Sequence, residues 1–219
     1  MNPNCVADWL FTSLTNIFFD LKDSYLTING LSTGEYSEKR SKFLAFAFHV
    51  ESTDEIKSLV SQYERKYYDA RHVCYAYMLG YLREQFRAVD NGEPSGTAGK
   101  PILGQLNKYG LTDVLVIVVR YFGGIKLGTS GLANAYKQAT IDAIDNACIE
   151  ERTVDVNFDV KFEYPMMNEV MRVVKELNPI ILSQDFQLVC HLQLRIRQGE
   201  ANCLQSRLEK IRGVVIERN

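Results

Sequence analysis

Alternating apolar and polar residues predict the architecture of residues 153–219. Every second position is apolar over 154–162 and again over 188–196, as expected for two strands with one buried face. Apolar residues at helical spacing over 165–177 and 204–211 predict two helices, and short apolar runs at 180–182 and 214–216 predict two more strands. The resulting order, β-α-β-β-α-β, is that of a ferredoxin-like fold. We therefore predict a ferredoxin-like C-terminal domain over residues 153–219.

The pattern over residues 21–152 predicts a larger domain that also mixes strands and helices, so the fold class is α+β. The stretch 113–119, which is apolar after Asp113, indicates its central strand, since a strand covered on both faces needs no polar side. Ser52 and Glu55 form a capping box that begins a helix over 53–67. The other predicted elements are strands at 25–28, near 35–36, at 41–50, 72–80 and 84–90, and helices from Pro101 to Gly110 and from Ser130 to Ala147.

Residues 1–20 stand apart from both domains. They contain no Lys or Arg and show little periodicity, so they match neither a signal peptide, which needs a basic start, nor a regular element. We expect them to form an N-terminal extension that precedes the first domain.

Composition excludes several classes of protein. Lys and Arg (25) nearly balance Asp and Glu (27), so no global basic field attracts nucleic acid and any such site must be a local patch. No apolar run reaches the roughly 18 residues of a membrane span. The five cysteines lie far apart without a C-x-x-C pair, which indicates neither a metal site nor a disulfide framework. We expect no metal, no cofactor and a reducing, cytoplasmic setting.

Two glycine-rich loops are the candidate binding sites. Each lies between a strand and the start of a helix, where unpaired N–H groups and the helix dipole favour anions. The alternative is that the glycines only permit tight turns and close packing. Neither loop matches a Walker A or G-x-G-x-x-G motif. The candidate residues for an anion or nucleic acid are Ser95, Thr97 and Lys100 in the first loop, and Arg120, Gly123, Gly124, Lys126, Gly128, Thr129 and Ser130 around the second.

Candidates for catalysis are few. His72 begins a predicted strand, and we expect it to meet the loop that carries Asp90 and Glu93. A histidine beside carboxylates could act as a general acid or base. A histidine at the start of a strand is, however, usually just a partly exposed polar residue.

The stretch from Gly99 to Gly128 resembles the signature of the IMPACT/YigZ family, in its bacterial two-domain type. The resemblance covers about residues 21–219. The matching residues are Gly99, Ile102-Leu103, Leu106, Leu111, Ile117-Val118, Arg120-Tyr121-Phe122-Gly123-Gly124 and Leu127-Gly128.

The resemblance implies a first domain similar to domain 2 of ribosomal protein S five and to domain IV of elongation factor G. It implies a second domain similar to domain V of that factor. A translation-linked role follows as an expectation, with the ribosome, RNA or a translation-associated protein as partner. Family members generally begin near Lys22, which agrees with an extension over residues 1–20.

Three functions are consistent with the sequence. The first is a non-enzymatic translation regulator or ribosome- or RNA-associated binding protein. The second is an enzyme that acts on a phosphorylated or otherwise anionic small molecule in a cleft formed by the two glycine-rich loops. The third is a protein–protein interaction module that uses the open sheet face of residues 153–219. The sequence leaves the physiological partner and the oligomeric state open.

Overall fold

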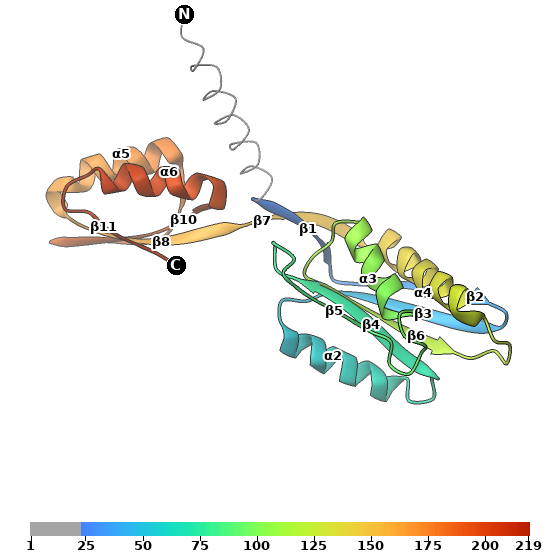
Figure 1. Cartoon of the computed structure of the whole chain (residues 1–219). Helices are drawn as coiled ribbons and strands as arrows, with labels where there is room; N and C mark the ends of the chain where they lie inside the picture. The colour runs from blue at the N-terminus through green and yellow to red at the C-terminus, as the bar shows by residue number, and fades with distance from the viewer. Residues whose placement is uncertain (1–22) are drawn as a thin grey trace, which may run out of the picture. The chain divides into compact units, whose positions relative to one another are not determined.

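A computed structural model describes residues 23–219, so the predicted extension over residues 1–20 lies outside the described residues. The chain divides into two compact units. The first unit is Tyr25–Arg152, and the second is Thr153–Asn219 together with Asp23 and Ser24. Each unit combines helices with an antiparallel sheet (Figure 1), which confirms the predicted α+β class.

A five-stranded antiparallel sheet forms the centre of the first unit, in the order β2-β3-β6-β4-β5. Its strands are β2 (Leu31–Glu38), β3 (Ser41–His49), β4 (His72–Leu79), β5 (Gln85–Val89) and β6 (Val114–Tyr121). Strand β6 lies in the middle, and its first seven residues are all buried. The unbroken apolar run therefore marks the central strand, as predicted, because this strand has no solvent-facing side.

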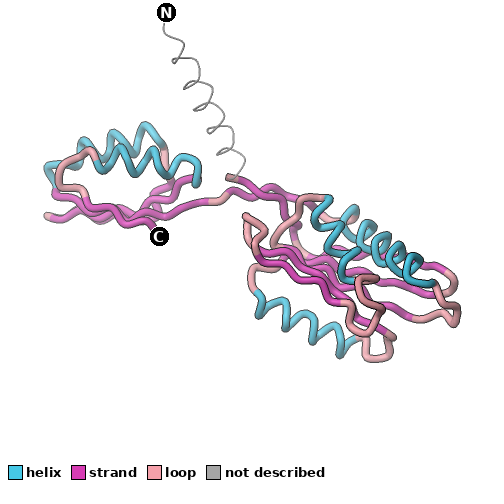
Figure 2. The backbone as a smooth tube through the Cα atoms, viewed as in Figure 1, coloured by secondary structure: helices cyan, strands magenta, loops and turns pink. Residues whose placement is uncertain are grey.

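Helices cover both faces of this sheet (Figures 1 and 2). Helix α2 (Thr53–Lys66) lies on one face, and helices α3 (Gly99–Lys108) and α4 (Gly128–Asp145) lie on the other. Helix α4 packs so closely on β2 that a Cβ atom at Gly34 would overlap the backbone of Ala143. Helix α4 also begins at Gly128, two residues before the predicted start.

The capping of α2 differs from the predicted capping box in one contact. The Ser52 hydroxyl accepts a hydrogen bond from the Glu55 N–H at 3.2 Å, as predicted. The Glu55 carboxylate, however, accepts from the N–H of Glu51 at 2.9 Å and not from that of Ser52. Both contacts satisfy donors at the start of the helix, so the predicted start of α2 at residue 53 is confirmed.

The sequence patterns missed one strand. Strand β7 (Cys148–Thr153) pairs with β1 (Ser24–Asn29) in a separate two-stranded sheet. Glu150, Glu151 and Arg152 are charged in succession at the end of the predicted first domain. The residues of β7 are exposed or half-buried, so no apolar alternation marks the strand.

The second unit has the predicted order β-α-β-β-α-β. Its four-stranded sheet has the order β11-β8-β10-β9, and α5 and α6 cover one face (Figure 1). The elements are β8 (Asp155–Glu163), the short 3-10 helix η1 (Tyr164–Met166), α5 (Met167–Leu177), β9 (Ile180–Phe186), β10 (Val189–Arg197), α6 (Gln198–Glu209) and β11 (Val215–Arg218). Strand β9 is longer than predicted because polar residues follow its apolar start.

No helix of the described residues is long and apolar enough to cross a membrane.

Candidate functional site

Arg120 lies at the centre of the candidate site. It is on the central strand β6, directly opposite Phe43 on β3 and His72 on β4. Only 7% of its side chain is exposed, and its guanidinium lies 5.6 Å from the ring centres of Phe43 and Phe122. The fold therefore buries a cation that the sequence indicated only as a positive charge beside the second glycine-rich loop.

Glu93 is the counter-ion of this arginine. Its Oε1 atom accepts hydrogen bonds from Arg120 Nη1 at 2.6 Å and from the Tyr136 hydroxyl at 2.9 Å, and its side chain is 2% exposed. Buried charges need a paired and hydrogen-bonded partner, since desolvation is costly. Arg120 Nε nevertheless has no hydrogen-bond partner among the described residues.

The buried Cys74 thiol lies beside the Tyr136 hydroxyl, which in turn donates to Glu93. The Cys74 thiol donates to the Asp90 carbonyl at 2.8 Å and lies 3.3 Å from the Tyr136 hydroxyl. Burial raises the pKa of the Cys74 thiol to about 12, although the hydrogen bond with Tyr136 lowers it in part. Burial, with the nearby Cys74 and Glu93, also raises the pKa of Tyr136 well above its usual value. Both groups are therefore protonated at neutral pH, and Cys74 is no nucleophile.

His72 lies beside this pair. Its Nδ1 atom is 3.0 Å from the Asn91 carbonyl, which only accepts hydrogen bonds, so this nitrogen carries a proton. Its Nε2 atom lies 4.0 Å from Glu93 Oε2. The structure thus brings His72 and Glu93 together, as the sequence analysis expected.

The first glycine-rich loop already holds an anion, and that anion is Asp90. Its carboxylate accepts backbone hydrogen bonds from Gly96 at 2.7 Å, Ala98 at 3.0 Å and Gly99 at 2.8 Å. The expected N–H donors at the start of α3 are thereby satisfied within the protein.

Asp90 should make the stability of the fold dependent on pH. Burial alone would raise its pKa, but the N–H groups of Gly96, Gly99 and Ala98, with the charge of Lys100, outweigh it and hold the pKa below the ordinary value of 3.8. A lowered folded-state pKa means that the ionised carboxylate stabilises the fold above the unfolded-state pKa, and that this contribution is lost as pH falls through the folded-state pKa.

We therefore expect Asp90→Asn to lower the free energy of unfolding by about 1 kcal/mol at pH 7. The difference from wild type should be smaller at pH 3, which lies below the ordinary pKa of 3.8, because the unfolded state already binds the proton there. Urea unfolding of the two proteins at both pH values measures this. A difference that is the same at pH 3 and pH 7 would contradict the assigned role of the carboxylate.

The second glycine-rich loop borders an open cavity. Helix α4 begins there without a side-chain cap, so its first N–H groups have no capping partner among the described residues. The cavity has a volume of about 470 Å³, and we call it the cationic pocket. Its walls are Arg71, His72, Gly92, Glu93, Pro94, Arg120, Phe122, Lys126, Leu127, Gly128, Thr129 and Leu132.

The charge of the cationic pocket comes from two side chains. Arg120 and Glu93 neutralise each other, whereas Arg71 and Lys126 are exposed and have no ion-pair partner among the described residues. Pro94, Phe122, Leu127 and Leu132 give apolar walls. Apolar walls with a few polar groups that point inward are typical of ligand sites.

The predicted site residues fall into two groups. Six of them line the cationic pocket: His72, Glu93, Arg120, Lys126, Gly128 and Thr129. The others do not line it: Asp90, Ser95, Thr97, Lys100, Gly123, Gly124 and Ser130. The Thr97 hydroxyl donates to the Pro94 carbonyl at 2.6 Å, and the Gly123 N–H donates to the Ser41 hydroxyl at 3.1 Å, so both groups are engaged within the fold.

Sequence reasoning did not select Arg71, Phe122 or Tyr136. Arg71 directly precedes His72, and Phe122 directly follows the Arg120-Tyr121 pair, so their positions next to candidates were the available signal. Tyr136 lies on the apolar stripe of α4, and nothing in that stripe distinguishes a hydrogen-bonding tyrosine from a packing residue. Among the described residues, no three potential metal ligands lie together.

Known proteins resemble this chain along most of its length. The family model of the Impact N-terminal domain matches residues 39–144. An IMPACT family member from Haemophilus influenzae is 33% identical over 198 residues, which cover 88% of this chain and 95% of the relative. The Escherichia coli family member YigZ is 31% identical over 160 residues, which cover 72% of this chain and 78% of YigZ.

A solved structure has the same fold. The crystal structure of a protein described only as hypothetical superimposes with a TM-score of 0.65 at 27% identity, covering 89% of this chain and 96% of that one. Fold and site thus define a two-unit α+β protein whose first unit carries a cationic pocket. The chain belongs to the IMPACT family.

Proposed function

We propose that the chain is a non-enzymatic, translation-linked binding protein of the cytoplasm whose cationic pocket binds phosphate groups of RNA. Membership of the IMPACT family supports the link to translation, because the family resemblance implies domains similar to those of ribosomal protein S five and elongation factor G. The partner would be the ribosome or an RNA bound to it. The near balance of charge over the whole chain limits such binding to a local patch.

We further infer a domain classification that agrees with this role. The first unit belongs to an IMPACT-type N-terminal domain over residues 21–152, which is similar to domain 2 of ribosomal protein S five. The second unit is a ferredoxin-like domain over 153–219, of the type of elongation factor G domain V. The strand order β11-β8-β10-β9 supports the ferredoxin-like assignment. It places the first and third strands of the β-α-β-β-α-β order in the middle of the sheet and the second and fourth strands at its edges.

One contrast carries the phosphate-binding proposal. Both glycine-rich loops lead into helices, but the N–H groups before α3 bind Asp90, whereas the start of α4 has no cap among the described residues. Lys126 stands beside the uncapped end, and Thr129 in its first turn offers a hydroxyl. A phosphate there would receive N–H donors, the helix dipole and a charged side chain together. The oxygens of such a phosphate would also lie in the pocket that Arg120 lines, and the buried Nε atom of Arg120 has no hydrogen-bond partner among residues 23–219.

Co-sedimentation with ribosomes at low salt tests this role. We expect wild-type protein to sediment with ribosomes, and the Arg71→Ala/Lys126→Ala variant to lose most of that association. The Lys137→Ala variant is the matched control, because Lys137 is exposed on α4 but does not line the pocket. Absence of wild-type association at low salt, or equal association of all three proteins, would contradict the proposal.

A second candidate function is an enzyme that acts on an anionic small molecule, and one observation favours it. His72 has its Nδ1 fixed by the Asn91 carbonyl, and the residue lines a pocket of about 470 Å³. That geometry suits a general base. A thermal-shift screen of phosphorylated metabolites tests it: a hit lost in both His72→Ala and Lys126→Ala supports the enzyme, and a screen without hits counts against it.

A further inference from the structure

A second concave surface lies between helix α2 and the edge of the five-stranded sheet. This cavity has a volume of about 310 Å³ and is separate from the cationic pocket. Helix α2 contributes Thr53, Ile56, Lys57, Val60, Ser61 and Glu64 to its wall. Strands β4 and β5 contribute the opposite wall, and Asn91 lies at one end. We call it the α2–β5 groove.

The groove has the length of a short strand. The helical residues that line it run from Thr53 to Glu64, which are eleven residues apart and so span about 16 Å along the helix axis. Strand β5 has five residues, or about 17 Å of extended chain. Arg87, Val89 and Asn91 line the groove at every second position, as they would for an extended segment lying along this strand.

The strand that borders the groove has no described strand on its outer side, and the start of helix α3 packs on its backbone at residues 88–89. Within residues 23–219, strand β5 is the last strand of the sheet and pairs only with β4, and four of its five residues are exposed. The outer edge of such a strand presents N–H and C=O groups that can pair with another chain. An edge strand next to a helix-lined groove is the arrangement by which extended peptides add to a sheet, with main-chain pairing for affinity and side-chain pockets for specificity.

The chemistry of the groove specifies the peptide. Its floor is apolar, with Ile56 and Val60 buried on α2 and Tyr75 and Tyr77 partly buried on β4. Arg87 on β5 faces the groove and has no ion-pair partner among the described residues.

The other charged groups of the groove are already engaged. Lys57 pairs with Asp54 at 2.9 Å, and Glu64 accepts a hydrogen bond from Asn91 at 3.1 Å. An incoming strand would therefore place apolar side chains on the floor and an acidic side chain against Arg87.

We propose that the α2–β5 groove binds an extended peptide segment of a partner protein by strand addition to β5, with an acidic residue opposite Arg87 and apolar residues two positions to either side. Residues two apart share one face of a strand, which sets this spacing.

A second copy of this chain fits less well. Antiparallel pairing of β5 with itself about its middle residue would set Arg87 directly against Arg87, and like charges in that position are destabilising. A nucleic acid also fits less well, because Arg87 is the one cation of the groove, among the described residues, without an acidic partner.

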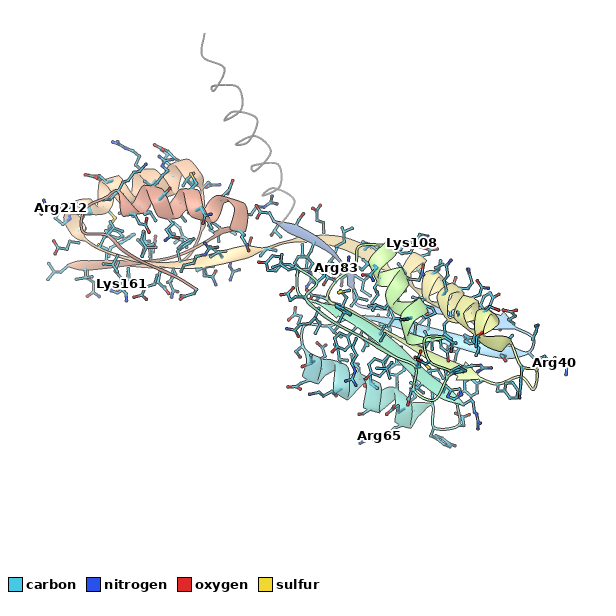
Figure 3. The ribbon with its side chains drawn as sticks, viewed as in Figure 1. Arg40, Arg65, Arg83, Lys108, Lys161 and Arg212 are labelled. Carbon is cyan, nitrogen blue, oxygen red and sulfur yellow. The ribbon has the colours of Figure 1, made fainter. Side chains whose placement is uncertain are left out.

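Titration of the full chain, labelled with ¹⁵N, with the synthetic peptide TVTETVT tests the proposal. We expect backbone amide shifts in β5 and in the lining residues of α2. Arg87→Glu should weaken binding of TVTETVT at least about fivefold and favour the TVTKTVT peptide instead, as a cross-strand charge pair would. Arg65→Glu, on α2 (Figure 3) but outside the groove, is the matched control and should leave the affinity unchanged.

Main-chain pairing is tested by two complementary versions of TVTETVT, each N-methylated at alternate residues. One version must lose binding, because its methyl groups replace the N–H groups that face β5. No amide shifts at millimolar peptide, an unchanged affinity in Arg87→Glu, or full binding by both methylated peptides would overturn the proposal. Self-association of the chain through β5, or displacement of the peptide by RNA, would overturn the choice of partner.

Discussion

Arg120→Ala should lower the free energy of unfolding of the first unit by about 3–5 kcal/mol. The reason is that the variant leaves the Glu93 carboxylate buried at 2% exposure without its cation. The Tyr136 hydrogen bond remains, but one neutral donor cannot replace a guanidinium at 2.6 Å. Urea unfolding followed by far-UV circular dichroism measures the loss.

The paired variant separates the cost of an unpaired charge from the cost of poorer packing. Glu93→Gln/Arg120→Met removes both charges and keeps an acceptor for the Tyr136 hydroxyl, so it should be more stable than Arg120→Ala by at least about 2 kcal/mol. If Arg120→Ala unfolds within about 1 kcal/mol of wild type, the pair is not a buried charge pair in solution. That result would also mean that Glu93 does not neutralise the charge of Arg120 in the pocket.

The second large effect is expected at Gly123. A Cβ atom at this position would overlap the backbone of Arg40, in the turn between β2 and β3, and of Ser41, the first residue of β3 (Figure 3 labels Arg40). Backbone cannot move aside as a flexible side chain can, so Gly123→Ala should cost about 3 kcal/mol of stability. The neighbouring Gly124 is the control: its φ is +87°, but no atom of the described residues lies within 4 Å of an added Cβ.

Gly124→Ala should therefore cost only about 1 kcal/mol, from the left-handed backbone alone. Thermal and urea unfolding of both variants give the comparison. Equal losses at the two positions would show that close packing at Gly123 is not what requires glycine. The expected difference assigns Gly123, a candidate for anion binding from its sequence alone, to the packing of the fold.

Much of the fold followed from local patterns in the sequence. The apolar run before Arg120 identified the central strand, and the alternation over 154–162 and 188–196 identified the inner strands of the second unit, because buried faces leave a periodic signal. Strand β7 has no buried face, so its sequence carries no periodic signal. Its pairing with β1 joins segments more than a hundred residues apart, which no local pattern encodes.

The site was harder to predict because its contacts are non-local. The sequence indicated that His72 would meet the loop of Glu93, but not that Arg120, 27 residues further on, would be buried against that carboxylate. Nor did it indicate that Asp90 would fill the anion site of its own loop. Two loops with similar composition thus have different roles. Only the three-dimensional arrangement of the side chains distinguishes the satisfied helix start from the uncapped one.

Salt-dependent binding of a fluorescently labelled single-stranded RNA, followed by anisotropy, tests the phosphate-binding pocket most directly. Removing one cation that binds a phosphate should reduce the slope of log affinity against log salt by about 0.7. For wild type we predict affinity that falls with salt, and for Arg71→Ala/Lys126→Ala a weaker affinity with a slope smaller by about 1.4. Lys137→Ala should match wild type. Identical affinity and slope in wild type and the pocket variant would contradict the account.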